Sequence, residues 1–185
     1  MDKKLSIEQI KALAKLNGYE YAALRAVIEV ESNGNGFASA GRLTIQFEPS
    51  WFKRTAKDWR KHESLITWVN NGVENQAKEY KAFTSAFHFS PAAAMKSTSI
   101  GLMQVMGFHY GLLGFRTVGE MWDYAKKSEA NQLELGIRFI KSNKKLDNAL
   151  KNMDWATFAY YYNGSEYRKY KYDTRLATAY KKFKS

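Results

Sequence analysis

An acidic residue on an apolar helix face is the first feature of this sequence that could do chemistry. A helix is predicted from about Tyr19 to Glu31, and Leu24, Val27 and Ile28 form one apolar stripe along it. Glu31 follows them at helical spacing and falls in the middle of this stripe. Burial and the negative end of the helix dipole both disfavour a charged carboxylate there, so they raise its pKa. Such a carboxyl group can donate a proton as a general acid; alternatively, it binds a neighbouring loop and fixes the following turn.

The groups used by several other enzyme classes are missing. The chain has no cysteine, which excludes disulfides, thiolate nucleophiles and zinc held by cysteine. It also lacks Gly-x-Ser-x-Gly, the phosphate-binding glycine loop, the dinucleotide fingerprint and His-Glu-x-x-His. The histidines, His62, His88 and His109, are far apart and lack the spacing of metal ligands. Carboxylate chemistry without a metal or a cofactor is therefore expected.

The elements that must position Glu31 are mostly helical. Ser6 and Gln9 form a capping box before a helix that ends at Asn17-Gly18. Apolar and polar residues then alternate over 43–48, which predicts a strand within a small β-hairpin near residues 36–48. Further helices are expected at about 50–60, 62–70, 73–86, 91–97, from near 101, 118–127, 129–141, 155–163 and 174–185. The fold class is mainly α with a minor β element, and no linker divides the 185 residues into two domains.

The net charge of +11 is unevenly distributed. Residues 141–185 contain eleven Lys/Arg and four Asp/Glu, a balance of +7. Such a basic region attracts polyanions such as lipopolysaccharide, anionic membranes or wall polymers; its simpler interpretation is a solvated basic face. No nucleic-acid-binding motif is found, so nucleic acid is not an expected partner.

Three segments of the chain together resemble a known family. Glu31-Ser32 at the end of a helix is followed by Gly101-Leu102-Met103-Gln104 and later by Ala159-Tyr160-Tyr161-Tyr162-Asn163-Gly164. Their order is similar to the signatures of the lysozyme superfamily, including soluble lytic transglycosylases and goose-type lysozymes. The segments 30–37, 41–42, 47–49 and 101–107 resemble more closely the N-acetylmuramidase domain of phage endolysins, over about residues 7–180.

This resemblance implies a lysozyme-like fold with a cleft between two lobes. It implies cleavage of the β-1,4 bond between N-acetylmuramic acid and N-acetylglucosamine in peptidoglycan glycan strands, with Glu31 as the general acid. Residues 1–185 are then one catalytic domain without a separate wall-binding module, and the basic C-terminal helix is a candidate substitute for that module. The enzyme is expected to be a monomer, made in the host cytoplasm without a signal peptide and active on the cell wall in the periplasm after release.

Other residues are assigned candidate roles on this basis. Glu48 lies on the polar face of the predicted strand and is a candidate general base; alternatively, it pairs with a residue such as Arg42. The candidate substrate-binding residues, whose polar groups can contact hydroxyl and N-acetyl groups, are Ser99, Gln104, Tyr162 and Asn163.

Two other functions remain open at the level of sequence. A lytic transglycosylase uses the 6-hydroxyl of muramic acid as the nucleophile, yields 1,6-anhydro products and needs no second carboxylate. A non-catalytic cationic binding domain would keep the lysozyme-like fold without its catalytic activity.

Overall fold

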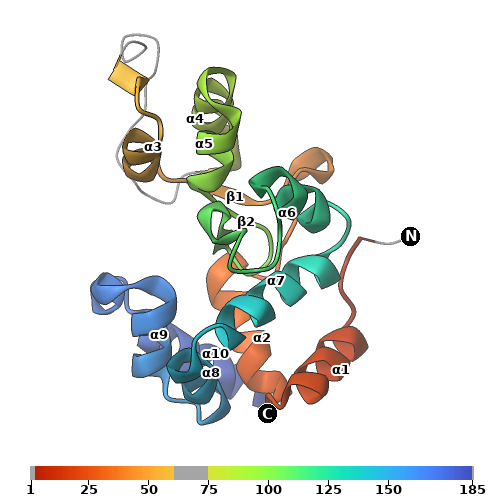
Figure 1. Cartoon of the computed structure of the whole chain (residues 1–185). Coiled ribbons are helices and arrows are strands. Elements are labelled where there is room, and N and C mark those ends of the chain that lie inside the picture. Colours follow the sequence, from red (N-terminus) through yellow and green to blue (C-terminus); the bar gives the residue numbers. More distant parts are fainter. Residues whose placement is uncertain (1–2, 61–74, 185) are drawn as a thin grey trace.

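The computed structural model describes residues 3–60 and 75–184, and the helix expected at 62–70 lies outside them. Helices dominate this part of the chain, as predicted (Figure 1). The α-helices are α1 (Ile7–Asn17), α2 (Tyr21–Ser32), α3 (Pro49–Thr55), α4 (Gln76–Phe89), α5 (Pro91–Lys96), α6 (Val118–Ala125), α7 (Glu129–Lys141), α8 (Lys144–Lys151), α9 (Trp155–Asn163) and α10 (Tyr172–Lys184). Short 3-10 helices are η1 (Ser39–Gly41), η3 (Gly107–His109) and η4 (Ser165–Arg168).

A small antiparallel sheet supplies the β element, in the order β1 (Ile45–Phe47), β2 (Thr98–Ile100) and β3 (Val105–Met106). The expected hairpin near 36–48 forms only in part. Phe37 and Leu43 make an isolated antiparallel bridge across η1, whereas β1 pairs with β2, with Gln46 opposite Ser99. The alternation over 43–48 is confirmed, because Leu43, Ile45 and Phe47 are buried and the polar residues between them are half-buried.

The free edge of β1 is closed by side chains of α4. The amide of Gln76 accepts from the N–H of Ile45 at 2.9 Å and donates to its carbonyl at 2.8 Å. The buried carboxylate of Glu79 accepts from the N–H of Phe47 at 2.8 Å. These bonds satisfy main-chain groups that a further strand on this edge would otherwise pair. They also fix the strand immediately before Glu48.

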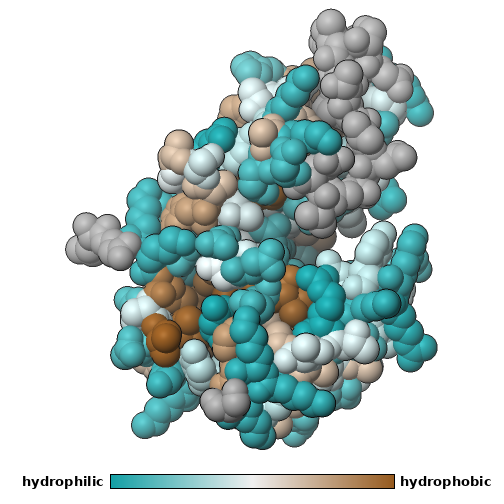
Figure 2. Space-filling model, turned by 180° about the vertical axis from the view of Figure 1, so that it is seen from behind, coloured by the Kyte–Doolittle hydropathy of each residue, from teal (hydrophilic) through white to brown (hydrophobic). Residues whose placement is uncertain are grey.

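Figure 1 shows two lobes. The sheet lies in the upper lobe with α3, α4 and α5, and the lower lobe contains α1, α8, α9 and α10, with α2 and α7 between them. One buried apolar cluster includes residues of both lobes, among them Leu24, Ile45, Leu133 and Phe158. Hydrophilic residues cover much of the back face in Figure 2, whose outline is indented on the right, where the two lobes meet. A cleft between lobes is the arrangement that the family resemblance implied.

The C-terminal helix packs along α2, the most extensive contact between two elements in the described part of the chain. Leu176 and Ala179 of α10 are buried in the core, and two basic side chains add polar contacts: Lys182 Nζ lies 2.9 Å from Glu29 Oε1 in a partly exposed pair, and Arg175 Nη2 donates to the carbonyl of Val30 at 3.0 Å. This last bond satisfies a carbonyl near the C-terminal end of α2. The helix is therefore part of the support of α2 as well as a basic surface.

Several details of the expected elements were wrong. Residues 101–104 form turns followed by β3 instead of a helix, because Gly101 and Gln104 have φ angles of 70° and 46°, in the left-handed region. The sequence analysis also did not predict α8. In the described ranges, 3–60 and 75–184, no helix combines the length and apolarity that crossing a membrane requires.

Candidate active site

Glu31 lies in the last turn of α2, at the end of the stripe that the sequence predicted. Leu24, Val27 and Ile28 are completely buried against the core, and Glu31 is half-buried. The next residue fixes the end of the helix, since Ser32 Oγ donates to the carbonyl of Leu102 at 2.8 Å. The carboxyl group is thus held by rigid structure on both sides of the turn.

The surroundings of Glu31 favour its protonated form. Burial raises its pKa from 4.5 to about 7. This effect outweighs two interactions that stabilise the charged carboxylate and lower the pKa. Asn163 Nδ2 donates to Glu31 Oε1 at 2.9 Å, and the positive charge of Arg175 also acts on the carboxyl. With this pKa, Glu31 is protonated in a large fraction of the molecules at neutral pH. Because the residue is only half-buried, it also stays partly exposed to solvent.

Asn163 reaches Glu31 from the last residue of α9. Asp154 caps the start of this helix by accepting from the N–H of Thr157, as predicted, and Gly164, with φ of 93°, ends it. The Oδ1 atom of Asn163 is buried and, among the described residues, has no hydrogen-bond partner. One side of this amide therefore holds the carboxyl group of Glu31, and the other side has an unused acceptor.

Glu48 follows β1 directly and precedes α3, which begins at Pro49. Its N–H donates to the carbonyl of Ser97 at 2.9 Å, and its Oε1 accepts from Gln46 Nε2 at 2.9 Å. Burial raises the pKa of Glu48 to about 7, and the nearby negative charge of Glu79 adds to this rise. The alternative of a pair with Arg42 is not found, because the guanidinium of Arg42 stacks 4.2 Å from the centre of the Tyr80 ring.

Tyr172 lies within electrostatic range of both carboxyl groups. Burial raises the pKa of its hydroxyl group, and the negative charges of Glu31 and, more weakly, of Glu48 add to this rise. The two acids, which are 17 positions apart in the sequence, therefore lie near one side chain at the start of α10. Sequence reasoning missed Tyr172, since no pattern in the chain indicates that α10 starts beside the end of α2.

Ser99 and Gln104 lie on the same side of the sheet as Glu48. Ser99 is paired with Gln46 across β1 and β2, so the two side chains share one face with Glu48. Ser99 Oγ donates to Gln104 Oε1 at 3.1 Å, and Gln104 Nε2 donates to the carbonyls of Gly101 at 2.8 Å and Thr44 at 3.3 Å. The amide of Gln104 is thus bonded within the protein and holds the 101–104 turn in place.

Tyr162 lies near Glu31 but is tied to the core. Its hydroxyl donates to the carbonyl of Met103 at 2.7 Å, and its ring stacks on Phe158 with centroids 5.1 Å apart. Burial, with the charge of Glu31, raises its pKa well above the ordinary range. Its hydroxyl group therefore stays protonated and links α9 to the 101–104 turn.

Two buried polar residues of α7, which sequence reasoning also missed, support the loops around the site. Glu129 Oε1 accepts from the N–H of Gly36 at 3.0 Å, and Gln132 Oε1 accepts from the N–H of Leu102 at 2.8 Å. A Cβ atom on Gly36 would lie 2.0 Å from Gln132 Oε1, so only glycine fits there. Glu129 and Gln132 are three residues apart and share one face of α7, and this spacing is the pattern from which sequence reasoning could have identified them.

These observations agree with the comparisons with known proteins. The model of the N-acetylmuramidase family matches residues 20–184. The chain belongs to this family. The crystal structure of a Burkholderia AP3 phage endolysin has a TM-score of 0.85 and 36% identity, covering 100% of this chain and 72% of the endolysin chain. The comparison with curated proteins found no match.

Family membership makes this N-acetylmuramidase a glycoside hydrolase with peptidoglycan as its substrate. It removes the alternative of a non-catalytic binding domain. In residues 3–60 and 75–184, histidine and acidic side chains nowhere gather in threes that could hold a metal ion. The site can supply one carboxyl group that stays protonated to about pH 7 and a second with a similar pKa, both near Tyr172.

Proposed function

We propose that Glu31 is the general acid of this N-acetylmuramidase. The carboxyl group gives its proton to the glycosidic oxygen that leaves when the β-1,4 bond between N-acetylmuramic acid and N-acetylglucosamine breaks. The observation that carries this proposal is its half-buried position with a pKa of about 7 beside Asn163. We also propose that Asn163 contacts the substrate: its Oδ1 is buried and has no partner among the described residues, and it would accept a hydrogen bond from a sugar hydroxyl or N-acetyl N–H group once neighbouring side chains move aside.

We further propose that Glu48 is the general base of an inverting hydrolysis. It takes a proton from a water molecule that attacks the opposite face of the sugar, and the resulting hydroxyl group remains on the muramic acid. Support comes from its half-buried place directly after β1, where Gln46 Nε2 donates to it, and from the electrostatic effect of both Glu48 and Glu31 on Tyr172. Ser99 and Gln104 position the sheet and the 101–104 turn beside it, and Tyr162 supports α9.

The pH dependence tests this pair of roles. Catalysis then requires Glu31 with its proton and Glu48 without one, and both pKa values are about 7. The rate against pH is expected to be bell-shaped, with its maximum near pH 7. In Glu48→Gln the limb on the acid side should disappear with most of the activity. A transglycosylase, which needs only the acid, would show a single fall above pH 7.

The products of digestion give an independent test. Purified peptidoglycan is digested with the native enzyme, Glu31→Gln, Glu48→Gln and the matched control Glu29→Gln, and the fragments are analysed by mass spectrometry. Hydrolysis yields reducing muramic acid ends, and Glu31→Gln is expected to lose activity by about 10²–10⁴-fold. Glu29 lies on the same helix but pairs with Lys182, so its variant should keep activity. Mainly 1,6-anhydro products would reject the hydrolase.

We propose that the basic face of α10 attracts anionic polymers of the cell envelope, including lipopolysaccharide. A groove of about 440 Å³ between α2 and α10 is lined by Lys171, Arg175 and Lys182. Deleting α10 would not test this, because Arg175 holds α2. A Lys171→Gln and Lys182→Gln double variant should bind envelope fragments more weakly and with less dependence on salt, compared with Lys144→Gln and Lys145→Gln on α8. Equal binding by both variants would reject the role.

We also propose that residues 1–185 fold and act as one monomeric catalytic domain. The buried cluster shared by both lobes supports this unit. The enzyme would be made in the host cytoplasm and reach the wall in the periplasm after release.

A further inference from the structure

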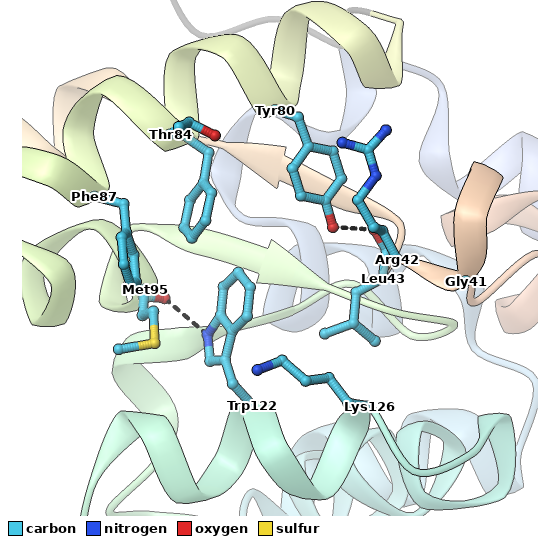
Figure 3. A pocket seen from close by; sticks show the side chains of 10 residues that line it. Gly41, Arg42, Leu43, Tyr80, Thr84, Phe87, Met95, Trp122 and Lys126 are labelled. Carbon is cyan, nitrogen blue, oxygen red and sulfur yellow. Dashed lines mark hydrogen bonds between the residues drawn. The ribbon is translucent and has the colours of Figure 1, made fainter.

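A second concave site lies away from the two carboxyl groups. The pocket has a volume of about 400 Å³ and is formed by α4, α6 and the segment between η1 and β1 (Figure 3). This volume is within the range of sites for small molecules, roughly 300–1,000 Å³. Its apolar lining consists of Leu43, Tyr80, Phe83, Phe87, Met95 and Trp122. None of the residues assigned to the active site lines it.

The polar atoms of its aromatic residues are already used. Tyr80 donates its hydroxyl hydrogen to the carbonyl of Leu43 at 2.7 Å, and Trp122 donates its N–H to the carbonyl of Met95 at 3.3 Å (Figure 3). Phe83 stacks on Trp122 with ring centroids 5.0 Å apart. The pocket therefore offers apolar ring faces and few hydrogen bonds, which suits a hydrocarbon chain better than a sugar.

Two cationic residues complete the lining. The guanidinium of Arg42 stacks on Tyr80 and, within the described part of the chain, makes no ion pair with a carboxylate. Lys126 Nζ lies 3.0 Å from Asp123 Oδ1, but this pair is well exposed and therefore weak enough to exchange partners. Both cations are exposed and adjoin an apolar cavity, so the site matches a ligand with an apolar body and an anionic end.

We propose that this pocket binds an anionic single-chain amphiphile, with its hydrocarbon chain against the apolar lining and its carboxylate or phosphate at Arg42 and Lys126. Burial of the chain supplies most of the binding free energy, and the cations select the charged end. Phe87, whose side chain is 37% exposed, lines the pocket and is available to cover part of the chain. The proposal does not depend on the roles of Glu31 and Glu48.

Calorimetric titration of the full chain with dodecyl phosphate below its micellar concentration tests the proposal. One molecule should bind per chain, whereas inorganic phosphate and dodecanol, which each lack one part of the ligand, should bind at least about fivefold more weakly. Thr84→Trp places a large side chain into the pocket from an exposed position and should abolish binding. Lys126→Glu should weaken binding by at least about fivefold.

Lys127→Glu is the matched control, because it changes the same charge one residue away and does not line the pocket. It should bind dodecyl phosphate as the native chain does. The proposal is overturned if the native chain does not bind, or if Thr84→Trp and Lys126→Glu bind as the control does. Retention on vesicles that contain lysophosphatidylglycerol, an anionic lipid with one chain, separates the two sources of the ligand: loss of retention in Thr84→Trp assigns a lipid held in a bilayer, and unchanged retention assigns a free amphiphile.

Discussion

Replacing Asn163 by leucine tests how the protonation of Glu31 is controlled. The amide donates to the carboxylate at 2.9 Å and thereby stabilises its charged form. Leucine is similar in size and cannot donate, so the pKa of Glu31 is expected to rise above about 7. Because Asn163 Oδ1 is buried without a partner among the described residues, its removal should not lower the free energy of unfolding by much.

The expected rise follows from the strength of the lost bond. A hydrogen bond to a charged group contributes about 1.5–3 kcal/mol, and one pH unit corresponds to about 1.4 kcal/mol. The pKa of Glu31 should therefore move up by about one to two units, to about 8–9. The charge of Arg175 still favours the carboxylate in this variant and keeps the rise at the lower end.

The assay is the pH dependence of kcat/KM for release of soluble fragments from purified peptidoglycan. Loss of a sugar contact would change the height of this profile, but the position of its basic limb reports the pKa of the acid in the free enzyme. Asn148→Leu, on the exposed face of α8, is the control and should leave the limb near pH 7. A basic limb that stays in place, or moves to lower pH, in Asn163→Leu would refute the assignment of Glu31.

Three further predictions concern stability and titration. Glu31→Gln should raise the free energy of unfolding, measured with urea, at pH 8 and not at pH 4. The native protein loses about 3 kcal/mol of stability as the pH rises from 4.5 to about 7, because Glu31 ionises less readily in the folded than in the unfolded chain. An equal effect of the substitution at both pH values would contradict the raised pKa. Gly36→Ala should lower the melting temperature, at a cost of about 1–3 kcal/mol, because its Cβ would lie 2.0 Å from Gln132 Oε1, whereas Gly111→Ala, with no atom within 4 Å, should not. His109→Gln should leave the pH profile above pH 5 unchanged, because burial lowers the pKa of His109 to about 4 and the ring stays neutral; a displaced limb would show that this histidine contributes to it.

Periodicity was sufficient to predict the local environment of both carboxyl groups. The helical spacing of Leu24, Val27 and Ile28 placed Glu31 on the buried face, and the alternation before Glu48 placed it on the polar face of a strand. These predictions succeeded because which face of an element is buried depends on residues close in the sequence.

Features that depend on distant residues could not be predicted. The strands β2 and β3 are too short for their own pattern: β2 forms because Ser99 is brought opposite Gln46 of β1, and β3 because Met106 is brought opposite Ser99. Buried acids such as Glu79 and Glu129 are exceptions to the rule that acids are exposed, and only the fold reveals the main-chain N–H groups that they bind. The placement of Tyr172 and the contact of Arg175 with α2 also depend on residues far apart in the sequence and could not be predicted from it.

The packing of α10 on α2 has a consequence for how the enzyme is made. The bond from Arg175 to the carbonyl of Val30 joins residues 145 positions apart. During translation, α2 leaves the ribosome long before α10 does, so a nascent chain holds the sequence of the site without its support. We expect such a chain to be inactive, so the protein should gain its ability to degrade the wall only late in synthesis.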